Sequence, residues 1–419
     1  MDSFIDKKFI RISLLNLLIV ALLGVLMRYK IGFEFNYFDQ KNLQHAHSHF
    51  AFTGWISQTI MILMVLLISK ELTKHRLKLF KLLLFSNLMA AYGMLISFAI
   101  SGYSLSSIIF SSISILTSFL FSYCYFKNLN LIKSKQIRRW FGAALFFNII
   151  SSLGTFALVY MMITKKIPQH NYLASVYWYL HFQYNGWYLF ACIGLFLGYV
   201  QSVVKQFKVS MVVFWLFATS CIPAYGLSVL WLKISPVLYI LIILAAIAQY
   251  LGGIIMLIRL RKYKFLENIR TNKLSVLLFI ILGIALAIKL SLQLGSTIPA
   301  ISKLAFGFRP IVIAYLHLAL LAITSVFLIT YIYATQKIKI NYLSISGIIL
   351  FVIGVYLNEI MLAVQGIASF SYTVIPGVNG MLLGISLLIL FGIFLIYFSQ
   401  LKKLLLNNFK HDDNHLLKS

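Results

Sequence analysis

Apolar segments of about 20 residues recur along the whole chain and are separated by short polar connections. This is the length that an α-helix needs to cross the hydrocarbon core of a bilayer. Twelve such segments are predicted, at residues 9–28, 45–68, 78–101, 104–126, 140–163, 173–200, 209–231, 236–260, 274–295, 309–334, 342–365 and 377–400. The pattern predicts an all-α polytopic membrane protein, with a single integral domain over residues 1–401 and a short polar cytoplasmic tail over 402–419.

The composition agrees with this pattern, because a chain that is 61% apolar and 11% charged cannot coat a soluble globule. Its 36 Lys and Arg residues far outnumber its 9 Asp and Glu residues, and they gather in alternate connections, such as 70–76, 133–139 and 259–262. This alternation is typical of the positive-inside rule. We expect a multi-pass protein of the inner (cytoplasmic) membrane with both termini in the cytoplasm. Membrane lipid, anionic at the inner surface, is the expected partner of the basic residues, and no nucleic acid is expected.

One short motif recurs at nearly constant spacing. Residues 49–55 (HFAFTGW) and 181–187 (HFQYNGW) agree at His, Phe, Gly and Trp, and a fainter third copy begins at His317 with Ala322 in the glycine position. The copies open the second, sixth and tenth apolar segments, so a unit of four helices is used three times. We expect twelve transmembrane helices in three four-helix arcs with pseudo-threefold symmetry. The histidines would face a common interior in the outer half of their helices.

Histidines at matching positions indicate a shared ligand site, although a lone imidazole in an apolar helix is more often a hydrogen-bonded core group. Neutral imidazole is a common ligand of haem iron, and two histidines on facing helices can clamp a macrocycle between them. The glycine of the motif would let a flat ring or a neighbouring helix approach. The following Trp would wall a cofactor or anchor packing. In the cluster at residues 44–49 (QHAHSH), His45 and His49 share a helical face while His47 points elsewhere. Such a cluster either binds copper or zinc or is a polar start at the membrane interface.

Three charged residues lie at unusual places. Glu359 and Lys289 fall inside predicted spans at a similar depth in the outer half. Buried ionisable groups are costly, so the two are candidates for proton handling or for an ion pair, with structural pairing or snorkelling of Lys289 as alternatives. Arg309, at the mouth of the tenth segment, is a candidate to hold a haem propionate, or it anchors the helix at the interface.

Two further segments carry a family resemblance. Residues 177–181 (YWYLH) are similar to the aromatic lead-in to the helix 6 histidine of the haem-copper oxidase superfamily, and residues 315–321 (YLHLALL) resemble its His-x-His-Leu signature in helix 10 with Tyr315 in place of the first histidine. The chain thus resembles subunit I of that superfamily, which includes the cbb oxidases, the nitric oxide reductases and the NnrS proteins. The resemblance implies twelve helices in three arcs.

The resemblance also implies ligands. His49 and His317 would be axial ligands of a low-spin haem b, and His181 would remain as a copper ligand. The chain departs from the family at residues 221–223 (CIP), where the family carries a histidine pair, so the binuclear iron-copper site is degenerate. Tyrosinate can also bind haem iron, which leaves a role for Tyr315.

A second register of the resemblance exists, because residues 47–55 (HSHFAFTGW) match the helix 10 signature better than helix 10 does. In this register, each ligand role passes to a histidine of the neighbouring four-helix unit. His49 and His181 would clamp the low-spin haem, His47 would hold a second haem, and His317 would face it. The sequence leaves both registers open.

These observations favour a membrane protein that binds at least one haem b and takes part in electron transfer or in the chemistry of O2 or NO, as an oxidoreductase. A cytochrome or a quinone would donate electrons, and partner subunits are expected. One alternative is a secondary transporter or metal permease, which would show helices broken near the midplane. The other is a non-catalytic haem-based sensor or assembly factor.

Overall fold

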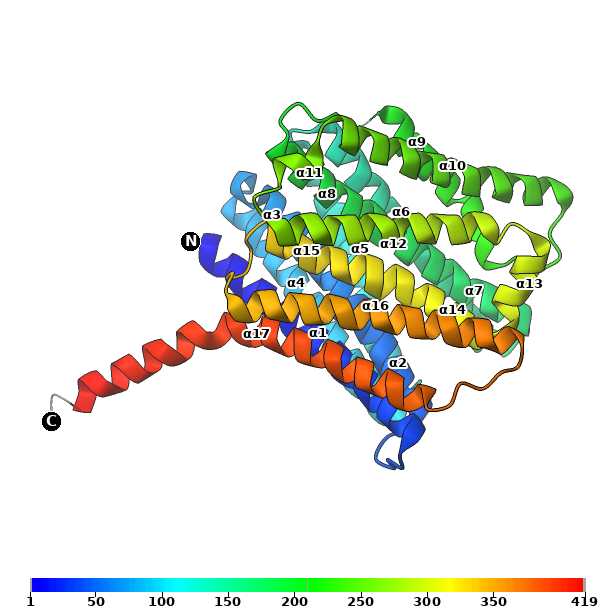
Figure 1. The fold of residues 1–419 in the computed structure, drawn as a ribbon, viewed down its shortest axis with the longest axis horizontal. Coiled ribbons are helices and arrows are strands. Elements are labelled where there is room, and N and C mark those ends of the chain that lie inside the picture. Colours follow the sequence, from blue (N-terminus) through cyan, green and yellow to red (C-terminus); the bar gives the residue numbers. More distant parts are fainter. Residues whose placement is uncertain (1, 209, 417–419) are drawn as a thin grey trace.

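The fold is known from a computed structural model, which describes the backbone of residues 2–208 and 210–416 and the side chains of residues 7–208, 210–303 and 306–401. These residues form helices and no strand, as the hydropathy pattern predicts. The helices run roughly along one direction and build a single bundle (Figure 1). The expected all-α class is therefore confirmed.

Eleven helical segments within the described residues are long and apolar enough to cross a membrane. Eight of them are α1 (Asp2–Gly32), α4 (Lys74–Ser101), α5 (Leu105–Asn128), α6 (Lys135–Thr164), α10 (Pro236–Lys262), α12 (Lys273–Gly295), α16 (Tyr342–Phe370) and α17 (Val378–Leu416). Each of the other three consists of an α-helix, a π-helical segment and a second α-helix. The first is α2 (Gln40–Phe50), η1 (Ala51–Ser57) and α3 (Gln58–Ile68), and the second is α7 (Gln169–His181), η4 (Phe182–Tyr188) and α8 (Leu189–Val203). The third of these composite helices is α14 (Arg309–His317), η6 (Leu318–Ser325) and α15 (Val326–Ala334). The short helices α11 (Phe265–Asn268) and α13 (Pro299–Gly307) and the 3-10 turns η2 (Ser69–Glu71) and η3 (Leu129–Leu131) lie in connections.

The seventh predicted segment, 209–231, differs from the expectation. Its α-helix, α9, covers only Met211–Cys221, and a 3-10 helix, η5 (Pro223–Ser228), follows. Pro223 explains the break, because proline lacks an N–H and its ring clashes with the preceding helical turn. In the region of the predicted polar tail, α17 continues to Leu416, and residues 417–419 lie outside the described part.

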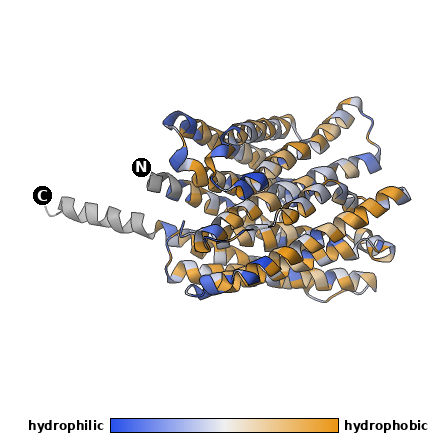
Figure 2. Cartoon of the chain, turned by 90° about the horizontal axis from the view of Figure 1, so that it is seen from above, coloured by the Kyte–Doolittle hydropathy of each residue, from blue (hydrophilic) through white to orange (hydrophobic). Residues whose placement is uncertain are grey.

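The three composite helices run through the interior of the bundle. The segments that contain η1 and η4 are the most deeply buried of the long spans, and residues 326–333 of the third are all buried. The other helices surround them, and α1 packs against α17 to close the bundle. The peripheral helices expose large apolar side chains, such as Leu82, Ile240 and Phe391. Figure 2 shows hydrophobic residues along most of the helix lengths. This exterior is suited to lipid and not to water.

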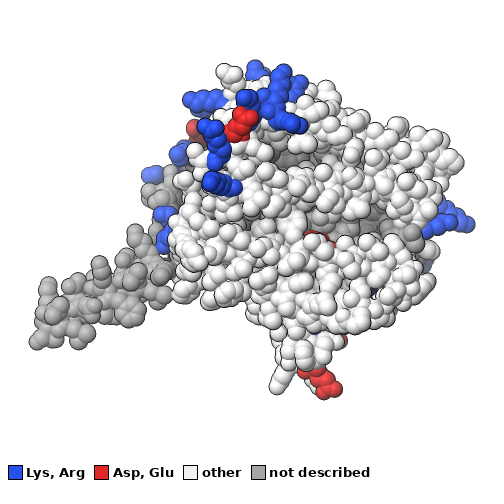
Figure 3. Space-filling view, in the orientation of Figure 1, with Lys and Arg blue, Asp and Glu red and all other residues white. Residues whose placement is uncertain are grey.

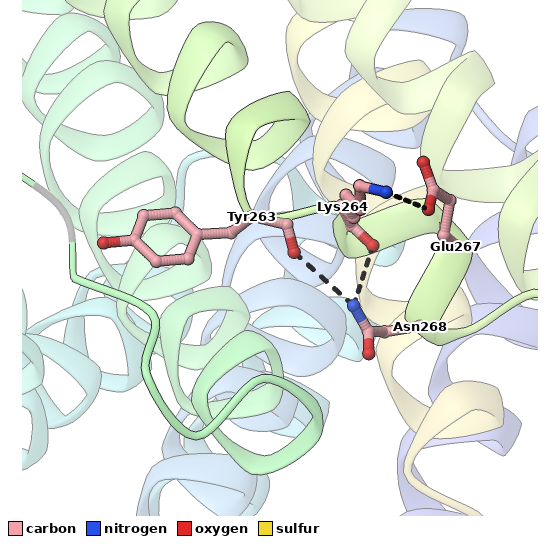
Figure 4. A network of polar contacts seen from close by, with 4 residues as sticks. All are labelled: Tyr263, Lys264, Glu267 and Asn268. Atoms are coloured by element: carbon pink, nitrogen blue, oxygen red, sulfur yellow. Dashed lines mark hydrogen bonds and ion pairs between the residues drawn. The ribbon is translucent and has the colours of Figure 1, made fainter.

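The two ends of the bundle differ in charge. Both termini lie at the same end (Figure 1), and most of the visible Lys and Arg side chains gather there (Figure 3). A turn at this end, between α10 and α11, is drawn in Figure 4. Its Lys264 forms an ion pair of 3.5 Å with Glu267, and the Asn268 amide donates to the Lys264 carbonyl at 2.9 Å. The polar groups of the turn are thus satisfied by its own neighbours.

Candidate functional site

Each of the three motif histidines is followed at once by a π-helical segment. The segments η1, η4 and η6 begin one or two residues after His49, His181 and His317. A π-helix is rare, appears mostly as a short bulge inside an α-helix, and is frequent at functional sites. Figure 1 shows α2, α7 and α14 in the half of the bundle away from the termini, and α3, α8 and α15 in the other half. The repeat of the sequence is therefore a repeat of one backbone irregularity midway along three interior helices.

Packing changes at these histidines. All seven residues of η4 are buried, whereas in α7 only His181 is buried, and α14 has no buried residue at all. His47, His49 and His317 are half-buried. The histidines therefore lie at a boundary, with a dense core on one side and looser packing toward the end opposite the termini.

The π-helical segments contact one another through their aromatic and hydroxyl side chains. The Trp55 indole donates to Ser325 Oγ at 2.9 Å, the Trp187 indole donates to Ser57 Oγ at 3.3 Å, and the Tyr188 hydroxyl donates to the Phe52 carbonyl at 3.1 Å. Both tryptophans are at most 1% exposed. They are packing anchors at the centre of the bundle.

The motif glycines also serve protein packing. A Cβ on Gly54 would lie 2.7 Å from the ring of Phe50, and a Cβ on Gly186 would lie 2.5 Å from Phe147 Cβ on α6. Both distances are too short for real carbon atoms. The space freed by each glycine is filled by a phenylalanine of this chain.

His47 and His317 share one environment. His47 Nδ1–H donates to the Val20 carbonyl of α1 at 3.1 Å, and His317 Nδ1–H donates to the Ile313 carbonyl at 2.9 Å. A carbonyl only accepts, so each Nδ1 carries the proton and each Nε2 keeps its lone pair. The two imidazoles are close enough for their charges to interact, and the Arg28 guanidinium acts on both. Two imidazoles with available Nε2 atoms thus lie within electrostatic reach of each other and of a cation.

Local sequence explains how these helices start. The Asp39 carboxylate caps α2 by accepting from the backbone N–H groups of Lys41 and Asn42. Pro310 stands in the first turn of α14, where its missing N–H costs nothing. Arg309 donates to Gln44 Oε1 at 3.3 Å, which joins the starts of the two helices above His47 and His317.

His49 faces another part of the bundle. Its ring stacks on Phe98 of α4, with centroids 4.3 Å apart and planes 12° apart, and lies edge-on to Tyr103. Its titratable neighbour is His45, one turn earlier. His47, and not His49, therefore interacts electrostatically with His317. The sequence already indicated this difference, because His47 and His49 of the 44–49 cluster lie on different faces of the helix.

His181 uses both ring nitrogens within the protein. Nε2–H donates to the Cys221 carbonyl at 2.8 Å, and Nδ1 accepts from the Asn185 amide at 3.1 Å. No lone pair is left for a metal in this arrangement. The break after α9 places the Cys221 carbonyl there, since Ile222 and Pro223 interrupt the helix.

The remaining candidate residues are dispersed. Tyr315 lies edge-on to Tyr184, with centroids 6.2 Å apart, so it faces η4. Lys289 is 2% exposed and donates to Gln293 Oε1 at 2.8 Å, while Glu359 accepts from the Asn358 amide at 3.3 Å. Lys289 and Glu359 thus have separate partners. The sequence did not mark Arg28 as a candidate site residue, because a basic residue near a helix end resembles an interfacial anchor.

In the part of the chain that the structure describes, no group of three or more His, Cys, Asp or Glu side chains could hold a metal ion. Comparison with known proteins found no family model and no curated protein sequence that matches the chain.

Proposed function

We propose that the chain is a haem-binding membrane protein in which His47 and His317 hold the iron of a b-type haem. The observation that carries the proposal is the pair of imidazoles on two interior helices, each with Nδ1–H bound to a backbone carbonyl. Ligating histidines nearly always fix the second nitrogen in this way, which orients the ring and raises its basicity. Because both residues are half-buried, the rings border looser packing and not the dense core.

Arg28 and Arg309 also fit a haem held by the two histidines. Haem carries two propionates, which arginine binds through charge-assisted hydrogen bonds. Arg28 acts electrostatically on both imidazoles, and Arg309 lies at the start of α14, above His317. Bound haem would supply one-electron redox chemistry and, where an axial ligand can be displaced, binding of O2 or NO. We therefore favour electron transfer or diatomic-gas chemistry as the function, with a cytochrome or quinone as electron donor.

The pairing favours one register of the resemblance to the haem-copper oxidase superfamily. In the second register His47 and His317 face each other across a haem, whereas the first pairs His49 with His317. The second register would also pair His49 with His181 on another haem. The two hydrogen bonds of the His181 ring argue against that other haem. We accordingly propose that the chain is a divergent relative of that superfamily and binds one haem.

We also propose that α9 together with η5 makes a twelfth crossing. The termini lie at one end of the bundle, which requires an even number of crossings. The eleven long segments found among the described residues leave one crossing to be supplied. The three π-helical segments support an arrangement of three four-helix arcs with pseudo-threefold symmetry. Both termini would be cytoplasmic, because the basic end carries them.

One observation supports a second candidate function. The break between α9 and η5 at Pro223 and the π-helical segments are interruptions of the kind expected for a secondary transporter. A transporter without haem would be purified as a colourless protein, so the same measurement separates the two functions.

The test is the absorption spectrum of the purified full-length protein. We expect a Soret band and sharp reduced-state bands of a six-coordinate b-type haem. His47→Ala and His317→Ala should each abolish the six-coordinate signal, whereas His75→Ala, at an exposed position, and His181→Ala should leave it unchanged. A colourless wild-type protein, or a spectrum insensitive to His47 and His317, would refute the proposal. Reduction of O2 or NO by the loaded protein would distinguish an oxidoreductase from a sensor or assembly factor.

A further inference from the structure

A second buried polar cluster lies around Lys289. Four side chains are at least nine-tenths buried: Lys289 and Gln293 on α12, Gln249 on α10, and Asn185 on η4. Lys289 donates to Gln293 Oε1 at 2.8 Å, and Gln293 Nε2 donates to Gln249 Oε1 at 3.4 Å. Lys289 also interacts electrostatically with His181 and Cys221, which join the cluster to α7 and α9. The cluster and the groups within electrostatic reach of Lys289 thus come from five helical elements, α7, η4, α9, α10 and α12.

The cluster contains a cation and no carboxylate. The ion pair of Lys264 with Glu267 lies elsewhere, and Glu359 is bound to Asn358. An ammonium has three donors, and one of them is used by Gln293. A charged group in a dry interior without a counter-ion costs several kcal/mol, so either the amine is neutral or an anion enters.

A second observation points to a ligand. Asn185 Oδ1 is buried and has no hydrogen-bond partner, although the Asn185 amide nitrogen binds His181. A buried carbonyl oxygen without a donor is costly. An anion that keeps one water molecule would supply an acceptor to the ammonium and a donor to this oxygen.

We propose that Lys289, Gln293 and Asn185 form a binding site for a small monovalent anion of the halide, nitrite or formate class. The ammonium supplies the charge, and the neutral amides supply orientation. The site is separate from His47 and His317 and goes beyond the haem-binding function, so either proposal can fail without the other.

The experiment is thermal unfolding of the purified full-length protein in detergent, titrated with sodium chloride, nitrite or formate against sodium gluconate at constant ionic strength and pH. We expect the Tm of the wild type to rise with at least one of these anions and to saturate, because a ligand of the native state stabilises it. Lys289→Met should lose the rise. Lys303→Met, which removes an exposed lysine, should retain it.

Two further variants keep the test decisive if Lys289→Met fails to fold. Lys289→Arg should retain an anion-dependent rise, and Gln293→Leu, which leaves the ammonium in place, should weaken it. A wild-type Tm that is the same in all these anions and in gluconate, or an equal rise in Lys289→Met, would overturn the site and indicate a neutral buried amine.

Discussion

At the scale of single residues, the ring nitrogens separate histidines that the sequence makes look alike. His181 occupies both nitrogens with Cys221 and Asn185, whereas His47 and His317 each occupy only Nδ1. His49 is held by its ring face on Phe98. Metal ligation requires a free lone pair, which excludes His181. The Nδ1–H bonds that orient their rings rank His47 and His317 above His49.

His49→Phe tests this ranking. Phenylalanine keeps the stacking on Phe98, which is worth about 0.5–1.5 kcal/mol, so we expect the variant to fold and to retain the haem spectrum. His47→Phe should lose the six-coordinate signal in the same measurement. If His49→Phe lost that signal and His47→Phe kept it, the pairing of His49 with His317 would be the correct one.

At the scale of elements, the π-helical segments need partners for the carbonyl groups that they release. In η1, the Asn16 amide donates to the Gly54 carbonyl and the Asn87 amide donates to the Thr53 carbonyl at 3.1 Å. In η6, the Tyr356 hydroxyl donates to the Ala322 carbonyl at 3.2 Å. Side chains of α1, α4 and α16 thus stabilise irregular backbone inside the bundle, where water is scarce.

Gly186→Ala tests the packing of η4. The new Cβ would meet Phe147 Cβ, which cannot rotate away, so α6 must shift. We expect a loss of about 1–3 kcal/mol of stability, as for other overpacked cores, seen as a lower Tm.

Gly283→Ala on α12 is the matched control for that variant, since a Cβ there meets nothing within 4 Å. The control should be neutral, or stabilised by up to about 1 kcal/mol through helix propensity. An unchanged Tm for Gly186→Ala would mean that η4 packs less tightly than the structure indicates.

At the scale of the whole molecule, the distribution of charge and the course of the helices together predict an orientation. The connection after α1 lies at the end opposite the termini and contains Tyr37, which is 85% exposed, whereas α11 lies at the basic end with the termini. The positive-inside rule assigns the basic end to the cytoplasm.

Labelling of single cysteines measures this orientation. In a background with Cys124→Ala, a membrane-impermeant maleimide should label Tyr37→Cys in intact cells and should label Glu267→Cys only after permeabilisation. The buried Cys192 and Cys221 should remain unlabelled in the folded protein. Labelling of both sites from the same side would contradict the proposed arrangement.

The sequence by itself determined the class of this protein and the place of its irregularities. Hydropathy is a local property summed over about 20 residues, so the all-α membrane fold and most of the spans could be read directly. The recurrence of His with Gly or Ala five residues later marked the three interior helices. Pro223 was visible too, but its effect of shortening α9 to Met211–Cys221 was missed because the apolar run continues through it.

Only the tertiary structure decided which side chains meet. The π-helical segments depend on hydrogen bonds from other helices, and the rotation of each helix about its axis sets which residues face one another. Two residues along α2 separate His47, which interacts electrostatically with Arg28 and His317, from His49, which stacks on Phe98. Lys289 likewise gained its neighbours from α7, α9 and α10, far away in sequence. Such pairings arise from packing between distant segments, which no local pattern of one chain specifies.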